Sequence, residues 1–230
     1  MTLDQLLPKW LKWLETIEGH VRSMLSDRYI FREVIKIVEA NPKTHDPNDF
    51  VMWFVQQYVE AASIRVRRLV DRDDRTVSLR RLLKDIEDHA DAITRKWFVQ
   101  QFTQDHLTGD EPRDSTAIGM AHGAFDRWSG KGKGHADFRI VMGHRRQLED
   151  ACKAIHRYVD KRIAHHDAIP TETLPLPTWG DLDRAIDTID KKTCRCIALL
   201  RQAGVKNGSL TETWQYEWTN VFEHPWKPPR

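Results

Sequence analysis

The chain has 230 residues and a formal net charge of +2, and 40% of its residues are hydrophobic while 30% are charged. This balance is typical of a globular protein with a sizeable core and excludes a disordered chain; no run reaches the roughly 18 apolar residues that a membrane span needs. Three cysteines are too few and odd in number for a disulfide framework. Because the N-terminal segment also lacks the pattern of a secretion signal, we expect a cytoplasmic protein without membrane contact.

Proline positions separate three long proline-free stretches that carry helical periodicity, and no stretch alternates as a strand does. The fold class is therefore expected to be all-α. The first predicted helices cover residues 9–25 and 27–40, within an N-terminal helical arm over residues 1–46. A third helix is predicted over 49–70, where apolar residues recur at steps of four and three. Arg65 falls in line with that stripe, so we expect either a core salt bridge or a site residue facing a cleft.

Helix starts are predicted at two hydroxyl residues further along the chain. Ser78 precedes "LRRLLKDIE" and Thr94 precedes "RKWFVQQFTQ", and both residue types favour the N-cap position. Residues 107–135 hold six of the eleven glycines. We expect a flexible insertion there, with a short helix over "AIGMAHGAFDRW" as the alternative.

The C-terminal part is predicted to contain two long helices and a tryptophan-rich tail. The first helix runs from Asp137 to His165, and the second begins at a capping pair of Thr178 and Asp181 and ends at Gly204. The Trp-rich C-terminal tail over 205–230 is expected to dock on the body as a hydrophobic clasp, with a base-stacking platform as the alternative. Short connections favour one domain, an antiparallel helical bundle.

Two polar segments are candidates for function. From Arg65 to Lys84 there are eight basic residues against three acidic ones, an excess that attracts phosphate unless it is a solvated surface with internal ion pairs. In "YVDKRIAHHD", residues 158–167, an imidazole lies beside cations at the end of a predicted helix. Such a pair suits acid–base work on a phosphodiester; the alternative is that the helix dipole alone favours these residues there.

Three stretches resemble the HEPN (higher eukaryotes and prokaryotes nucleotide-binding) superfamily, and within it the bacterial abortive-infection AbiU-like type. They are "IRVRRLVDRDDRTVSLRRLLKDI" at 64–86, "YVDKRIAHHD" at 158–167 and "WTNVFEHPW" at 218–226. The resemblance implies an antiparallel helical bundle that forms a homodimer with two motif helices together. In active members it implies RNA cleavage that needs neither metal nor cofactor. The implied partners are RNA, a cognate antitoxin or another protein.

The family motif places an arginine, commonly followed by a polar residue, before a histidine, with four to six positions between them. His165 matches the histidine and Asp160 the polar position, while Val159 stands where the arginine is expected. The resemblance implies the catalytic residues His165, Asp160, Lys161 and Arg162. It implies the RNA- or phosphate-binding residues Arg65, Arg68, Tyr158 and His166. Either Arg65 or Arg68 is expected to pair with Asp160 or to supply the missing charge.

Two main functions stay open at this point. The first is an endoribonuclease of bacterial defence or a toxin–antitoxin pair, with His165 as acid and base. The second is a non-catalytic module that binds a protein, nucleotide or RNA partner, which the valine at the motif position favours. A metal site at His165, His166 and Asp167 is a weaker third, since adjacent helical residues point about 100° apart.

Overall fold

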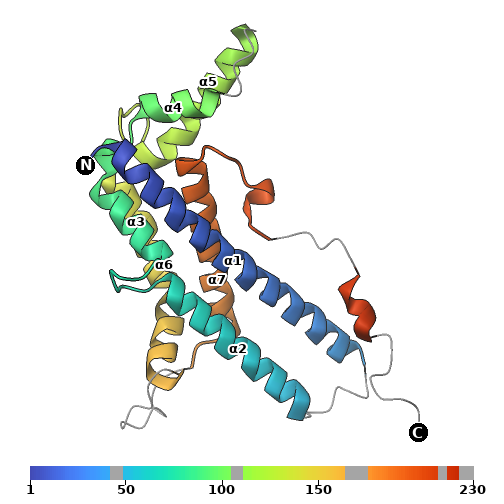
Figure 1. Cartoon of the computed structure of the whole chain (residues 1–230). Helices are drawn as coiled ribbons and strands as arrows, with labels where there is room; N and C mark the ends of the chain where they lie inside the picture. Colours follow the sequence, from blue (N-terminus) through green and yellow to red (C-terminus); the bar gives the residue numbers. More distant parts are fainter. Residues whose placement is uncertain (42–48, 105–110, 164–175, 212–216, 223–230) are drawn as a thin grey trace.

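The structure, a computed structural model, describes residues 1–41, 49–104, 111–163, 176–211 and 217–222 (Figure 1). Within these ranges helices are present and strands are not, which confirms the all-α class. The helices are α1 (Leu3–Ala40), α2 (Asp49–Leu69), α3 (Leu79–Asp88), η1 (Ala90–Ala92), α4 (Arg95–Thr103), α5 (Glu111–Ser129), α6 (Phe138–Tyr158), the π-helix η2 (Val159–Ile163), α7 (Trp179–Leu200), η4 (Lys206–Gly208) and η5 (Trp218–Phe222).

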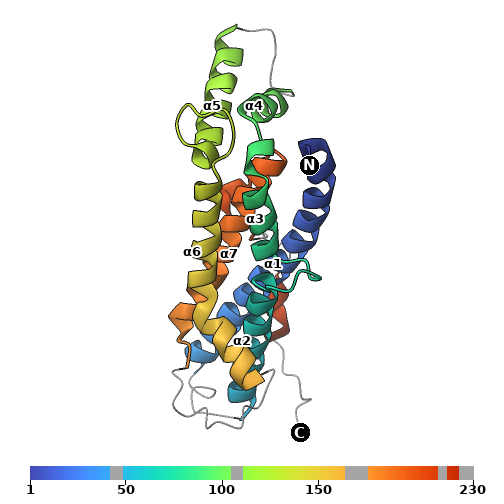
Figure 2. The ribbon, with the colours of Figure 1, turned by 90° about the vertical axis from the view of Figure 1, so that its left-hand side faces the viewer.

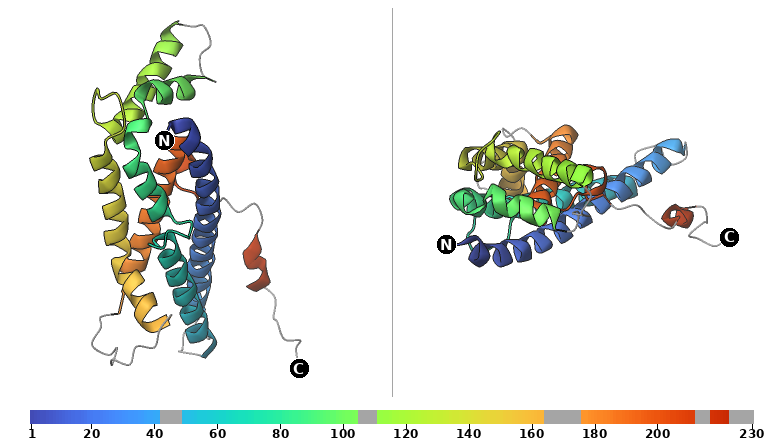
Figure 3. Two further views of the ribbon diagram at one scale, coloured as in Figure 1. Left: turned by 60° about the vertical axis from the view of Figure 1, so that its left-hand side comes forward. Right: turned by 90° about the horizontal axis from the view of Figure 1, so that it is seen from above.

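Four antiparallel columns form the bundle. α1 runs down, α2 and then α3 run up in one column, α6 runs down and α7 runs up (Figures 1 and 2). α6 packs against α7, α3 and α2, and α1 packs against α7 and α2. Helices α4 and α5 pack on each other and project beyond one end of the bundle (Figure 3). The loop between α2 and α3 therefore lies halfway along the bundle, beside α6.

Helix α1 is one continuous helix, so the expected pair of helices over 9–25 and 27–40 is wrong. The buried stripe that includes Leu14, Val21 and Leu25 continues to Val34, and it spans the expected break. A side chain on the same face every three or four residues keeps the helix packed on the core along its length. Because burial begins at Leu6, the N-terminal segment is a full member of the bundle rather than an arm beside it.

The predicted helix starts are confirmed. The Ser78 hydroxyl accepts a hydrogen bond from the backbone N–H of Arg81 at 3.1 Å, and the Thr94 hydroxyl accepts one from Trp97 at 3.2 Å. Thr178 and Asp181 form a reciprocal capping box at the start of α7. These local bonds satisfy backbone donors that a helix leaves unpaired, and each contributes about 1 kcal/mol.

Two predicted boundaries are wrong. A 19-residue helix, α5, occupies most of the expected flexible insertion and exceeds the short alternative. Ala121, Phe125 and Trp128 are buried one turn apart and hold it in place, which outweighs the cost of two helical glycines, about 1 kcal/mol each. At the other end, α7 stops at Leu200, before the expected end at Gly204, and Gln202 just beyond it adopts a left-handed conformation with φ of 52°.

The described part of the tail touches α1. The rings of Trp218 and Tyr29 meet edge to face with centroids 6.2 Å apart, as a docked tail requires. Val221 and Phe222 of the same short helix are exposed. The other tryptophans of the expected clasp, Trp214 and Trp226, lie outside the described residues.

Candidate nucleic-acid interface on α6

The C-terminal end of α6 widens into the π-helix η2, Val159–Ile163. π-turns inside or at the end of α-helices are frequent at functional sites. Ile155 and Val159 point into the hydrophobic core, and Val159 is only 4% exposed. The position expected to carry the motif arginine is therefore a core position, where a charged side chain would lose its hydration.

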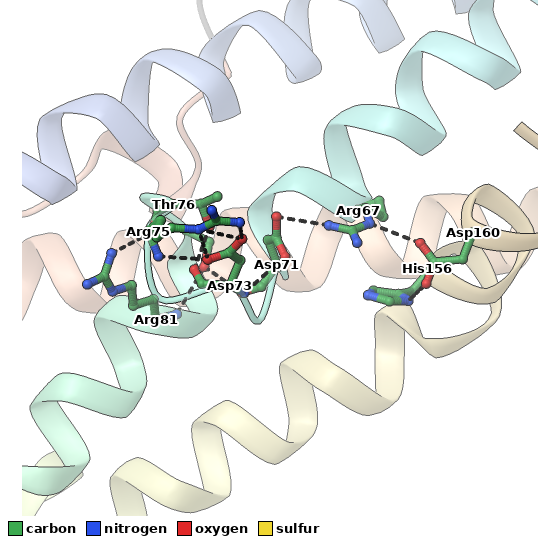
Figure 4. Close-up of polar contacts among 9 residues, drawn as sticks. Arg67, Asp71, Asp73, Arg75, Thr76, Arg81, His156 and Asp160 are labelled. Atoms are coloured by element: carbon green, nitrogen blue, oxygen red, sulfur yellow. Dashed lines mark hydrogen bonds and ion pairs between the residues drawn. The ribbon is translucent and has the colours of Figure 1, made fainter. Parts of the chain in front are cut away.

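Arg67 of α2 is the arginine that contacts Asp160. Its Nε donates to Oδ1 of Asp160 at 3.1 Å, and its Nη1 lies 2.9 Å from Oδ2 of Asp71 (Figure 4). The two carboxylates hold the guanidinium between α2 and η2. The expected pairing of Asp160 with Arg65 or Arg68 is wrong: Arg67 makes this contact, and each residue along a helix turns by about 100° from the one before it.

Arg65 belongs to a different contact. Its Nη2 lies 2.8 Å from Oδ2 of Asp27 on α1, and its Nη1 donates to the hydroxyl of Ser23. The expected salt bridge is confirmed, but at the edge of the core, since 33% of the arginine side chain is exposed. Burial raises the pKa of Asp27 while Arg65 opposes that rise. This contact ties α1 to α2 and lies away from Asp160.

His156 completes the cluster around Asp160. Its Nδ1 lies 3.0 Å from Oδ2 of Asp160, one turn further along the helix (Figure 4). Burial, with Arg67 and Arg72 nearby, holds the pKa of His156 below its usual value although Asp160 opposes the shift. The neutral imidazole therefore dominates at pH 7. Sequence reasoning missed this residue, although a histidine four positions before an aspartate on a predicted helix was the signal.

The loop between α2 and α3 is held by its own hydrogen bonds. Asp73 accepts from the backbone N–H of Arg75 at 2.9 Å, and its pKa falls to about 2 because of hydrogen bonds from Arg75. Nη1 of Arg81 donates to the carbonyl oxygen of Thr76 at 2.9 Å (Figure 4). These bonds fix the path of the loop, so Arg72 stays beside α6, where it lines a groove with His156 and Asp160.

Two grooves run along the exposed side of α6 and share three cations. We call Lys153, Arg157 and Lys161 the basic ridge, because all three line both grooves. The loop-side groove has a volume of about 420 Å³ and has Arg72 on its far wall. The α7-side groove has a volume of about 320 Å³ and has Arg184 on its far wall. Steps of four along a helix bring side chains into line, so the three cations form one strip, with Asp150 also lining both grooves beside Lys153.

Most carboxylates beside the ridge already have their own polar partners. Glu149 accepts from Nε of Arg80 at 2.5 Å, and Asp160 accepts from Arg67 as described above. Asp181 accepts from the backbone N–H and the hydroxyl of Thr178, the N-cap of α7. Asp150 is exposed. Since paired carboxylates neutralise the ridge only weakly, the strip retains an attraction for anions.

The predicted site residues thus separate into three groups. Asp160, Lys161 and Tyr158 come together at the grooves, with Tyr158 on the α7 side. Neither Arg65 nor Arg68 lines a groove, and Arg68 is exposed. The side chain of Arg162 and the whole of His165 and His166 lie outside the described residues, so their predicted roles stay predictions.

Within the described ranges, no three His, Cys, Asp or Glu residues are placed to hold a metal ion together. None of the described helices has the length and apolar character to cross a membrane. No protein-family model, no curated protein and no solved structure matches the chain. The HEPN resemblance therefore rests on the three sequence stretches alone.

Proposed function

We propose that the protein is an HEPN-like RNA-binding protein of bacterial defence, and that a single strand of RNA binds along the basic ridge. The observation that carries the proposal is the sharing of Lys153, Arg157 and Lys161 by two adjacent grooves. Cations four residues apart on a helix lie roughly 5–6 Å from one another, a spacing that suits successive phosphates of an extended strand. Phosphate contacts of this kind dominate the affinity of proteins for nucleic acids.

Features of the α7-side groove favour a single strand over a duplex. Tyr158 and Leu176 line this groove together with two alanines of α6, so apolar surface lies directly beside the cations. An unstacked base can pack on an aromatic ring, which is the usual way in which single-stranded RNA is bound. A duplex keeps its bases stacked and offers only phosphates and sugars.

Endoribonuclease activity is the second candidate function. It is favoured by the orientation of Asp160, which two side chains hold next to the ridge. The family resemblance assigns the acid–base role to His165. On the same resemblance we propose a cytoplasmic homodimer with a cognate antitoxin or another protein as its partner. The alternative to endoribonuclease activity is a non-catalytic module that only binds its partner.

Fluorescence anisotropy with a labelled single-stranded RNA tests the main proposal. Replacing Lys153, Arg157 and Lys161 together by alanine should weaken binding at least about 10-fold in 0.1 M salt. The slope of log Kd against log salt should fall by about 2, since each lost phosphate contact removes about 0.7 for a single strand.

A matched control removes the same charge elsewhere. Lys12, Lys96 and Lys191 are exposed lysines on α1, α4 and α7 that line neither groove. Their triple alanine variant should bind RNA like the wild type. The proposal fails if the wild type does not bind RNA saturably, or if both triple variants lose affinity equally.

A further inference from the structure

The loop-side groove brings a histidine, an aspartate and several cations together. His156 and Asp160 line it, with Arg72 from the loop and the three residues of the basic ridge. The family motif does not include His156, and the expected acid–base residue, His165, belongs to another position in the chain. The placement of His156 beside Asp160 and these cations therefore indicates a role in the chemistry of the loop-side groove.

Two contacts orient the imidazole of His156. Asp160 faces Nδ1 through Oδ2 at 3.0 Å, while its other oxygen accepts from Arg67 at 3.1 Å. A carboxylate at Nδ1 stabilises the tautomer that carries its proton there, which leaves a lone pair on Nε2. In Figure 4 the ring extends away from Asp160, so Nε2 lies on the side opposite the carboxylate.

We propose that His156 is the general base of an RNA-cleaving site in the loop-side groove, with Asp160 and Arg67 as positioning residues. The proposal rests on RNA binding along the basic ridge. A phosphate held by the ridge and by Arg72 would place the neighbouring ribose at the mouth of the same groove. The substrate must be RNA rather than DNA because the reaction needs a 2′-hydroxyl group, and the apolar surface beside the ridge favours a single strand.

The reaction is a transesterification without electron transfer. Nε2 of His156 takes the proton of the 2′-hydroxyl, and the O2′–P bond forms while the P–O5′ bond breaks. Water donates a proton to the departing O5′, and the resulting hydroxide takes the proton from His156 and restores the site. The products carry a 2′,3′-cyclic phosphate and a 5′-hydroxyl end. Cations of the ridge stabilise the extra negative charge on the phosphorus oxygens in the transition state.

The charges around His156 give the reaction a defined dependence on pH. Asp160 and Asp71 favour the protonated ring, whereas burial, Arg67 and Arg72 disfavour it. The remaining charged groups of the groove are Glu149, Asp150, Lys153, Arg157 and Lys161. Because the neutral ring is the active form, the rate should rise with pH through the lowered pKa of His156 and then level off, at a lower pH than an unperturbed imidazole would give.

The test uses the full chain, a 5′-labelled single-stranded RNA and excess EDTA, with cleavage and binding measured on the same samples. His156→Ala should lower kcat by about 100-fold or more, with the Kd for RNA changed by less than about 3-fold. The glutamine of His156→Gln can still donate a hydrogen bond to Asp160. This variant should lose as much cleavage activity as His156→Ala, while its free energy of unfolding stays equal to that of the wild type. His89→Ala is the control, since that ring contacts a backbone oxygen far from the groove.

Asp160→Asn separates a positioning role from a structural one. Removing the carboxylate should lower kcat and move the acid limb of the pH profile to lower pH, because Asp160 favours the protonated ring. A merely structural aspartate would leave the limb in place. RNA with 2′-O-methyl groups should bind and stay intact.

The outcomes distinguish this inference from the proposed function. RNA binding without cleavage at any pH overturns the catalytic role of His156 and leaves RNA binding standing. Cleavage that survives both His156 variants but disappears in His165→Ala also overturns it. If the wild type neither binds nor cleaves RNA, both proposals fail.

Discussion

Replacing Val159 by arginine would restore the family motif, and the structure predicts that the variant is destabilised rather than activated. Val159 is 4% exposed and lies in the hydrophobic core beside Ile155. Burying a valine side chain contributes roughly 1.5–3 kcal/mol, and an unpaired buried charge costs several kcal/mol more. We therefore expect Val159→Arg to lower the free energy of unfolding by at least about 3 kcal/mol.

Urea unfolding followed by circular dichroism measures this change, with RNA cleavage measured on the same preparations. Val159→Ala should lose about 2 kcal/mol, because it removes two buried methyl groups without adding charge. Ala198→Arg is the matched control, since Ala198 is an exposed residue of α7 that lines neither groove, and it should change stability by less than about 0.5 kcal/mol. A Val159→Arg protein with wild-type stability and increased RNA cleavage would refute the placement of this residue in the core.

Three further predictions concern other contacts. A double-mutant cycle of Arg67→Ala and Asp160→Ala should give a coupling of about 0.5–1 kcal/mol, because both side chains are about a third exposed; no measurable coupling would contradict the contact. Burial, Lys192 and Arg195 lower the pKa of His144 from 6.5 to about 4. Between pH 6.5 and about 4, His144 therefore binds a proton in the unfolded chain but not in the folded chain. The free energy of unfolding should fall by up to about 3 kcal/mol as the pH drops through this range. His144→Gln should flatten that part of a pH series of urea unfolding curves. Phe125→Ala should cost about 3–5 kcal/mol in thermal unfolding, because its fully buried ring packs α5 on α4; a loss below about 1 kcal/mol would argue against this packing.

Local signals predicted most of the helices. Ser78, Thr94 and Thr178 cap helices through bonds to residues only three positions away, so the sequence carries the whole signal. The long-range packing of α1 and α5 carried no comparable signal. Glycines suggested a flexible insertion over 107–135, but the buried stripe through Phe125 decided the structure of α5. Intrinsic helix propensity predicts helices poorly where tertiary packing strongly stabilises them.

The site was predictable only in part, for a geometric reason. Tyr158, Asp160 and Lys161 follow from one helix and do line the grooves. Which arginine of α2 reaches Asp160 depends on the rotation of α2 against α6, and a single residue step changes the direction by about 100°. Arg67 was therefore missed although its neighbours were considered. His156 lies outside the family motif, and only its four-residue spacing to Asp160 on one helix indicates the contact between them.

Photocrosslinking tests the central claim, RNA binding on the exposed side of α6, most directly. A single-stranded RNA that contains 4-thiouridine would be irradiated with the full chain, and the crosslinked peptides identified by mass spectrometry. We predict adducts at Tyr158 and Lys161, with yields that fall when the ridge is replaced by alanine. Phe50 and Trp53 form an exposed aromatic pair near the start of α2 and are the natural competing surface. Crosslinks confined to that pair, unaffected by the ridge substitutions, would contradict the account.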